Sequence, residues 1–244
     1  MKLISLNVEG SKHIERVETF LAAEKPDVVC LQEVQPNLEA FLKSQGYSVA
    51  FLPMTLREVN GSEIEEGILM ATKFQTTFDS FYYYEPKGEL QLYEQERRRE
   101  TCAHGVLYAD IHFEEKKYSI ATTHFTWTPD GTIAGPEQIT DMVSFLKRVE
   151  QLPPHVICGD FNIPRDLNHL YGELTTKYTD NIPLHYKSSL DGTLHRLGKL
   201  PEKAHMFEEY MVDYVFTERP YTASEVHLVF GVSDHAAVVA TIQQ

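Results

Sequence analysis

The chain has 244 residues with 22 basic and 36 acidic side chains, which give it a formal net charge of −14. This acidic balance argues against broad nonspecific binding to DNA, which needs a basic face, although a bound cation can reverse the local field at a phosphate site. The hydrophobic content of 42% is typical of a globular protein with a sizeable core, and no shift in composition divides the sequence, so we expect a single domain over residues 1–244.

Cysteine content and apolar segments argue against two further classes of protein. Three cysteines without CxxC spacing predict neither a disulfide framework nor a zinc site. Cys30 and Cys158 lie inside apolar runs, so we expect both in the core. The first strand begins at Lys2, which leaves no room for a signal peptide, and no apolar segment approaches the roughly 20 residues of a membrane span. We therefore expect a cytoplasmic protein without membrane insertion and without an obligate protein partner.

The first third of the sequence alternates strands and helices. Apolar strands are expected at 2–6 and 27–33, on either side of a helix that Ser11 can cap and Pro26 ends. A second helix can open at Pro36. The first helix should bury one face, formed by Ile14, Val17 and Leu21.

The rest of the sequence predicts a β-rich middle followed by mixed elements. The strands expected there are 47–52, 67–72, 79–84, 104–111, 117–123, 155–159, 210–217, 224–230 and 236–242. A helix over about 136–150 should bury Ile139, Met142, Leu146 and Val149. A short helical stretch is expected near 167–174, and 183–205 is typical of a long loop that could close over a substrate. This order predicts an α/β fold of two packed sheets covered by outer helices.

Polar residues end two of the apolar runs. The strand at 155–159 leads into Asp160, and Asn162 follows two residues later. Because an unpaired buried carboxylate costs several kcal/mol, we expect Asp160 to lie in a cleft at the end of its strand. The run before Glu33 repeats the pattern. Carboxylates at several strand ends indicate a hard divalent cation and a hydrolytic reaction.

Six short motifs follow one another along the chain. They are Leu6-Asn7, Leu31-Gln32-Glu33, Thr123-His124-Phe125, Gly159-Asp160-Phe161-Asn162, Val212-Asp213-Tyr214-Val215-Phe216 and Ser233-Asp234-His235. In this order and at these intervals, from about residue 3 to 240, the chain resembles the endonuclease/exonuclease/phosphatase superfamily of metal-dependent phosphodiesterases and phosphatases. The resemblance implies a DNase I-like, four-layer α/β/β/α sandwich of two packed mixed sheets with outer helices.

The resemblance implies a Mg²⁺ site, in which Mn²⁺ can substitute, with Glu33 as principal ligand and Asn7 beside it. Their oxygen atoms suit Mg²⁺ or Mn²⁺ better than zinc or copper. Asp234 is expected to contribute to the metal or water network. Taken singly, Glu33 could be a surface acid after a strand and Asn7 a turn residue.

Two residues of the fourth motif are expected to act on the attacking water. Asp160 and Asn162 are two residues apart, so on an extended backbone both side chains would point to one side. The resemblance implies that Asp160 activates the water and that Asn162 positions it by hydrogen bonds. The alternative interpretation is a turn that caps the following helix.

Two histidines are candidates for donors to the phosphate. The resemblance implies that His235 donates in its charged form and that Asp213 fixes its tautomer and raises its pKa. His124 matches the DNase I-like, sphingomyelinase-like and deadenylase-like branches, and could stabilise charge or assist the leaving oxygen. The alternatives are a surface Asp–His dipeptide and an inert histidine at a strand end.

Two side chains are candidates for binding the rest of the substrate. Arg99 belongs to the basic cluster Arg97–Arg99 and could meet a phosphate, although the surrounding glutamates favour a salt-bridged surface patch. Trp127 lies in a polar loop and could stack on a base. Phe125 and Phe161 could stack in the same way or pack in the core.

These residues predict a Mg²⁺-dependent hydrolase in which water attacks phosphorus in line. The leading hypothesis is a nuclease-type phosphodiesterase, with short or single-stranded nucleic acid among its candidate phosphate-ester substrates. A phosphatase or phosphodiesterase acting on a small phosphorylated molecule or a phospholipid head group stays open. The alternatives of other classes are a catalytically silent binding scaffold of the same fold and a calcium-binding structural protein, which would need a denser loop of acids.

Overall fold

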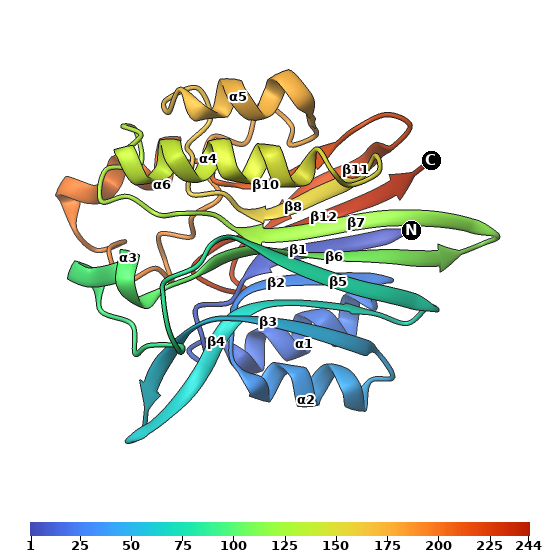
Figure 1. Ribbon diagram of the computed structural model, residues 1–244, viewed down its shortest axis with the longest axis horizontal. Coiled ribbons are helices and arrows are strands. Elements are labelled where there is room, and N and C mark those ends of the chain that lie inside the picture. The colour runs from blue at the N-terminus through green and yellow to red at the C-terminus, as the bar shows by residue number, and fades with distance from the viewer.

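The computed structural model describes residues 1–244 and contains two packed mixed sheets (Figure 1). The first sheet consists, in spatial order, of β11 (Thr222–Val229), β12 (Ala237–Gln243), β1 (Lys2–Asn7), β2 (Val28–Val34), β4 (Ser62–Thr72) and β3 (Ser48–Val59). The second consists of β5 (Thr76–Tyr84), β6 (His104–Phe113), β7 (Lys116–His124), β8 (Val156–Asp160), β10 (Asp213–Thr217) and β9 (Thr179–Asp180). Each sheet has one parallel pair, β1 with β2 and β7 with β8.

Helices cover the outer faces of the two sheets. Helices α1 (Ile14–Glu24) and α2 (Pro36–Ser44) lie against the first sheet, and α4 (Pro136–Val149) and α5 (Leu170–Lys177) against the second (Figure 1). The short helices α3 (Arg98–Thr101) and α6 (Ala204–Glu209) lie in connecting segments. The predicted four-layer α/β/β/α sandwich is therefore confirmed. None of the helices combines the length and the apolar character that a membrane-spanning segment needs.

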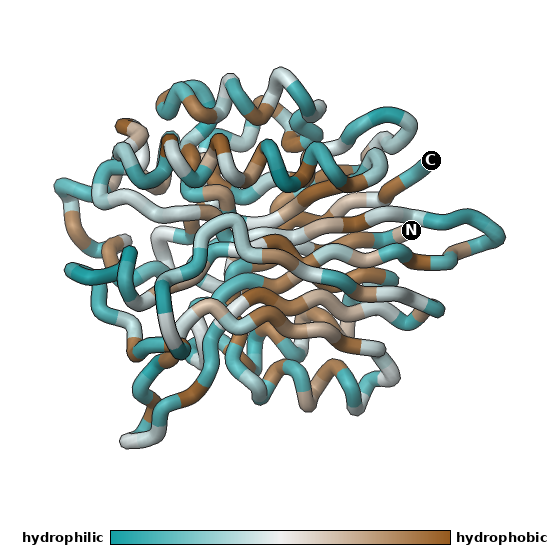
Figure 2. Tube along the Cα trace, in the orientation of Figure 1, coloured by the Kyte–Doolittle hydropathy of each residue, from teal (hydrophilic) through white to brown (hydrophobic).

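The alternation of side chains along β2 shows how the layers are held. Val28 and Cys30 pack into the large cluster between the sheets, whereas Val29 and Leu31 pack with the helices on the outer face. This follows from the two-residue period of a strand. Cys30 and Cys158 are free and fully buried, which confirms the core position predicted for both. Figure 2 shows hydrophobic residues concentrated along the strands and hydrophilic residues at the outer turns.

The boundaries of the β3–β4 hairpin differ from those predicted. The two strands extend to either side of Asn60-Gly61, far beyond the predicted ends at 52 and 67. Both turn residues have positive φ, at 52° and 79°, as a tight hairpin turn requires. The sequence did not show this extension, because the outer part of the hairpin is largely exposed and polar and so lacks a hydrophobic pattern.

Two helix predictions were wrong in detail. The N-cap of α1 is His13 and not Ser11, because Gly10, with φ at 66°, turns the chain before the helix begins. In α4 the predicted inner residue Ile139 is 41% exposed. The buried face instead includes Gln138 and Asp141, because both side chains form hydrogen bonds with Thr126, in the loop after β7. Met142 and Val149 are buried as predicted.

The predicted loop at 183–205 has little regular structure, although α6 begins within its last two residues. The strand expected at 210–217 begins only at Asp213. The segment around Leu190 forms an isolated antiparallel bridge to His235. This bridge attaches the loop to the edge of the sheets where the predicted site residues lie.

Candidate active site

The predicted site residues come from strand ends that meet at one edge of the molecule. Asn7 ends β1, Glu33 lies near the end of β2, His124 ends β7, Asp160 ends β8, Asp213 begins β10, and Asp234 and His235 precede β12. Parallel strands present their carboxyl ends at the same edge, and the register pairs Asp160 with both His124 and Asp213. We call these seven residues the floor of the cleft.

The backbone at two positions directs the floor side chains. Glu33 has φ at 54°, and the register of β2 against β4 shifts beside it. Such a bulge re-aims a side chain, so Glu33 faces the cleft while its neighbour Gln32 is fully buried. At Gly159 a Cβ atom would lie 2.0 Å from the backbone oxygen of Thr123. Only glycine therefore allows β8 to approach β7 closely before Asp160.

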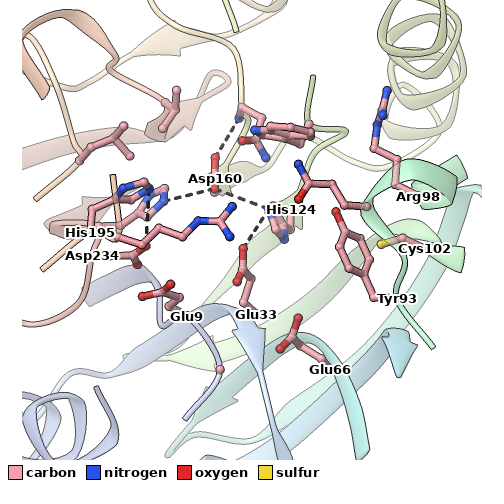
Figure 3. A pocket seen from close by; sticks show the side chains of 18 of the residues that line it. Glu9, Glu33, Glu66, Tyr93, Arg98, Cys102, His124, Asp160, His195 and Asp234 are labelled. Atoms are coloured by element: carbon pink, nitrogen blue, oxygen red, sulfur yellow. Dashed lines mark hydrogen bonds and ion pairs between the residues drawn. The ribbon is translucent and has the colours of Figure 1, made fainter. Parts of the chain in front are cut away.

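The Asp160 carboxylate lies at the centre of the floor (Figure 3). The Asn7 amide Nδ2 donates to Asp160 Oδ2 at 3.1 Å and to Glu33 Oε1 at 3.2 Å. His124 Nε2 lies 3.6 Å from Asp160 Oδ2 and 3.9 Å from Glu33 Oε1. His235 Nε2 lies 3.9 Å from the same Asp160 oxygen. Side chains from both sheets thus meet within one small volume.

His235 and Asp213 form a buried pair. Nδ1 of His235 lies 2.8 Å from Asp213 Oδ2, and both side chains are almost inaccessible to solvent. Burial disfavours the charged imidazole, but the carboxylates of Asp213 and Asp160 outweigh it and raise the pKa of His235 well above its usual range. The raised pKa favours the protonated imidazole, and its Nε2 lies on the side of Asp160.

Asn162 adopts a conformation that the sequence analysis did not predict. Its φ is 52°, so the backbone is left-handed and not extended. The Asn162 N–H donates to Asp160 Oδ1 at 2.9 Å, and its side-chain Nδ2 donates to the backbone oxygen of Phe125 at 2.9 Å. The turn of the alternative interpretation is therefore present, but no helix follows it until α5 begins at Leu170. Asn162 still lines the cleft next to Asp160.

Asp234 has two neighbours beside the floor, Glu9 and His13, that were not predicted from the sequence. One oxygen of its carboxylate, one of the Glu9 carboxylate and a ring nitrogen of His13 all lie within 4.8 Å of one another. Burial raises the pKa of Asp234 to about 7, and the negative charges of Glu9 and Glu33 add to the effect. The position of Glu9, two residues after Asn7 at the end of the first strand, was the one signal in the sequence that could have identified it.

The structure separates the three arginines of the predicted basic cluster. Arg97 pairs with exposed glutamates, as the salt-bridge interpretation predicted. Arg99 is not at the cleft, because its Nη2 bonds Asp141 Oδ1 at 2.7 Å on α4. Arg98 lines the cleft in its place, with its guanidinium 5.7 Å from the centroid of the Trp127 ring. The expectation that Arg99 meets substrate therefore finds no geometric support.

The cleft above the floor is large, with a volume of about 1170 Å³. Trp127 lines it. Phe125 also borders the cleft, but both Phe125 and Phe161 are fully buried, so neither can stack on a ligand. Among the other lining side chains are several from hairpins and loops, and we call five of them the rim. They are Arg57, Tyr93, Arg98, Trp127 and His195. Trp127 was a candidate from the sequence, and Arg98 was expected only as a member of the basic cluster Arg97–Arg99. The other three were not predicted.

A family model described as the endonuclease/exonuclease/phosphatase family matches residues 4–235. The chain belongs to this family. Its members hydrolyse phosphoesters and generally use a divalent metal, so the chain is an enzyme acting on phosphate ester bonds. No curated protein matches the chain in sequence.

Several solved structures share the fold at low sequence identity. D. rerio TDP2 in complex with a single-strand DNA product is 19% identical, with a TM-score of 0.71 over 100% of this chain and 99% of that one. The catalytic domain of human Nocturnin with a bound sulfate anion is 16% identical, with a TM-score of 0.67 over 100% and 93%. A Bacteroides thetaiotaomicron mannosyl-6-phosphatase is 11% identical, with a TM-score of 0.65 over 100% of both chains. At these identities the likeness concerns the fold alone.

Proposed function

We propose that this protein is a Mg²⁺-dependent phosphodiesterase, in which Mn²⁺ can replace Mg²⁺. A water molecule attacks the phosphorus atom in line with the bond to the leaving oxygen. The observation that carries the proposal is the position of Asp160, whose carboxylate has Asn7, His124 and His235 around it in one cleft. Acid, amide and imidazole groups at such distances can orient water and bind a phosphoryl group at the same time.

The donor atoms of the floor fit a hard cation. Glu33, Asn7 and Asp234 would hold it, and Glu9 adds a further carboxylate close to Asp234. Carboxylate and amide oxygens are the ligands that Mg²⁺ prefers, and it commonly takes only one or two of them while it keeps sites for substrate oxygens. When bound, the metal would neutralise charge on the phosphoryl oxygens and contribute several kcal/mol to catalysis.

The remaining steps belong to side chains of the protein. Asp160 accepts the hydrogen bond of the attacking water and takes its proton, and Asn162 positions the water from the adjoining turn. His235, kept charged by Asp213, donates from Nε2 to a phosphoryl oxygen. His124 donates from the side of β7, and its position also suits stabilisation of the leaving oxygen.

The rim supports short or single-stranded nucleic acid as the substrate class. Trp127 and Tyr93 offer aromatic rings, and each lies against an arginine, Arg98 and Arg57 respectively. Aromatic rings bind unpaired bases by stacking with little regard to sequence. A small phosphorylated molecule is the second candidate, because a net charge of −14 opposes extended contact with a polyanion.

A substrate panel tests the proposal. Single-stranded oligonucleotides, a chromogenic phosphodiester, sugar phosphates and phospholipid head groups would be assayed with Mg²⁺, with Mn²⁺ and with chelator. We expect metal-dependent turnover of the diesters by the parent protein and none by Asp160→Asn. Metal binding without turnover of any ester would instead support the binding scaffold, and turnover in chelator would contradict the metal requirement.

A further inference from the structure

The segment from Ser188 to Gly198 is fixed to the floor of the cleft and is not a free loop. The N–H of Ala236 donates to the Ser189 oxygen at 2.7 Å, and the N–H of Asp191 donates to the Asp234 oxygen at 2.8 Å. The buried Asp191 carboxylate also accepts the N–H of Gly231 at 2.7 Å. These bonds continue the bridge between Leu190 and His235. The segment therefore keeps a defined position relative to Asp234 and His235.

A tight turn in this segment presents His195 to the cleft. The N–H of His195 donates to the Asp191 oxygen at 2.8 Å, and the backbones of Gly192 and Gly198 meet so closely that a Cβ on Gly198 would lie 1.8 Å from the Gly192 oxygen. The His195 ring packs against the Phe207 ring of α6 at a centroid distance of 5.4 Å. The orientation of the imidazole is thus set by backbone and by packing.

The hydrogen bonds of His195 determine its tautomer. The N–H of Leu197 donates to His195 Nδ1 at 3.1 Å, so Nδ1 is an acceptor and the proton of the neutral ring is on Nε2. The nearest acidic atom to Nε2 is Asp234 Oδ2 at 3.9 Å, which is beyond hydrogen-bond range. The ring is only 12% exposed, and its Nε2–H is directed at the cleft without a protein acceptor. A partly buried, oriented donor of this kind fits an anionic ligand.

His195 and His124 lie on opposite sides of Asp160 (Figure 3). His124 belongs to the second sheet, whereas His195 comes from the segment bonded to Asp234. A phosphate group bound above Asp160 would therefore have an imidazole on each side. Only His235 and His124 among the cleft histidines were selected from sequence motifs, so His195 adds a third.

We propose that His195 is a substrate-binding residue whose Nε2–H donates a hydrogen bond to the phosphoryl group of the bound ester. This inference rests on the proposed function of the cleft. It adds a contact from outside the strand-end motifs, and it gives the 188–198 segment a role in fixing the phosphate and not only in closing over it.

Two substitutions of His195 separate the hydrogen bond from the packing. His195→Phe keeps a ring against Phe207 but removes the donor, whereas His195→Gln keeps an N–H donor. With inorganic phosphate as the probe and Mn²⁺ present, we expect His195→Phe to weaken binding, measured by calorimetry, about tenfold, and to raise KM for a chromogenic ester similarly. His195→Gln should recover part of the loss, and Lys199→Ala, at the exposed residue directly after the segment, should match the parent.

Nuclear magnetic resonance of the parent protein provides a readout that does not depend on how the variants fold. The Nε2 resonance of His195, assigned by its absence in His195→Gln, should shift on titration with inorganic phosphate. An unshifted resonance, or parent-like phosphate affinity in His195→Phe, would overturn the inference. Weakened Mn²⁺ affinity with unchanged phosphate affinity would also overturn it, because His195 would then only position Asp234. If no ester is hydrolysed by the parent protein while phosphate still shifts the resonance, the proposed function fails and the binding contact stands.

Discussion

The floor and the rim are built differently, although most residues of both line the same cleft. Floor residues stand at strand ends, and most of them bond to one another, as in the Asn7 contacts to Glu33 and Asp160. Rim residues come from hairpins, short helices and loops. Most of their contacts are with one another or with side chains outside the floor, as Arg57 contacts Tyr93 and Glu66.

This difference separates chemistry from recognition. The floor is rigid because strands of both sheets hold its backbone, which suits groups that must be placed within a fraction of an ångström for catalysis. Side chains on loops tolerate replacement without loss of the core, which suits selection of a substrate. Substitutions in the floor should therefore act on kcat, and substitutions in the rim on KM.

The strongest test of the comparison is Asp160→Asn in the floor. We expect kcat to fall about 1000-fold, because the amide cannot take a proton from water, while the melting temperature stays close to that of the parent. Steady-state kinetics and thermal denaturation measure the two effects. Asp79→Asn, at an exposed position of β5, is the matched control and should retain parent kcat. Equal activity of Asp160→Asn and parent protein would refute the role of Asp160.

Asp213→Asn tests whether the charge on His235 matters. Removal of the carboxylate should lower the pKa of His235, because Asp213 is the main group that opposes the effect of burial. We expect kcat at pH 7 to fall by about 10- to 100-fold, as for other groups that orient a functional imidazole. Titration followed by nuclear magnetic resonance measures the pKa. A lowered pKa with unchanged kcat would show that the reaction does not need a charged His235.

Trp127→Ala tests recognition by the rim. For a single-stranded oligonucleotide we expect KM to rise about tenfold with kcat nearly unchanged, because one stacking contact is lost. Trp127→Phe should restore much of the affinity. For a small ester without a base, neither substitution should change KM. An equal increase for both substrates would mean that Trp127 shapes the cleft and does not bind a base.

Substitutions of the three adjacent arginines, Arg97, Arg98 and Arg99, should have the smallest effects, and they test which of the three contacts substrate. Arg99→Ala leaves the buried Asp141 without its charged partner, and we expect a loss of about 1–2 kcal/mol in stability with unchanged KM. Arg98→Ala should instead raise KM by a few-fold with little change in melting temperature, since Arg98 lines the cleft. Arg97→Ala, at an exposed ion pair, should change neither quantity. A rise in KM for Arg99→Ala alone would restore it as the substrate contact.

Much of the floor could be predicted from the sequence, because a charged or amide side chain after an apolar strand has few stable positions other than a cleft. Glu33 and Asp160 both carry this signal. Glu9 carries a weaker one and was missed, since a single acid after a strand end is also typical of an ordinary turn. Asn162 was correctly predicted to lie beside Asp160, but its backbone conformation was not. The backbone is left-handed because Asn162 lies in the turn around Asp160, whereas an extended strand was expected.

Apart from Trp127, the rim could not be predicted, because its other residues have no periodic or positional signal of their own. Arg98 and Arg99 are neighbours in sequence, and the packing of α3 against α4 decides which of them faces the cleft. Gln138 and Asp141 were not among the inner residues expected for the helix at 136–150, yet they are buried because Thr126 and Arg99 supply their hydrogen-bonding partners. Such partners lie far away in sequence.

By itself the sequence determined the layered α/β fold, the order of the strand-end motifs and the oxygen-rich donor set. An apolar strand must be buried while the acid at its end must stay hydrated or paired, and only a few arrangements meet both requirements. Only the tertiary structure decided that Glu9 joins Asp234, that Arg99 turns away from the cleft and that His195 turns toward it. Those outcomes depend on contacts between distant segments, and such contacts leave no local pattern in the chain.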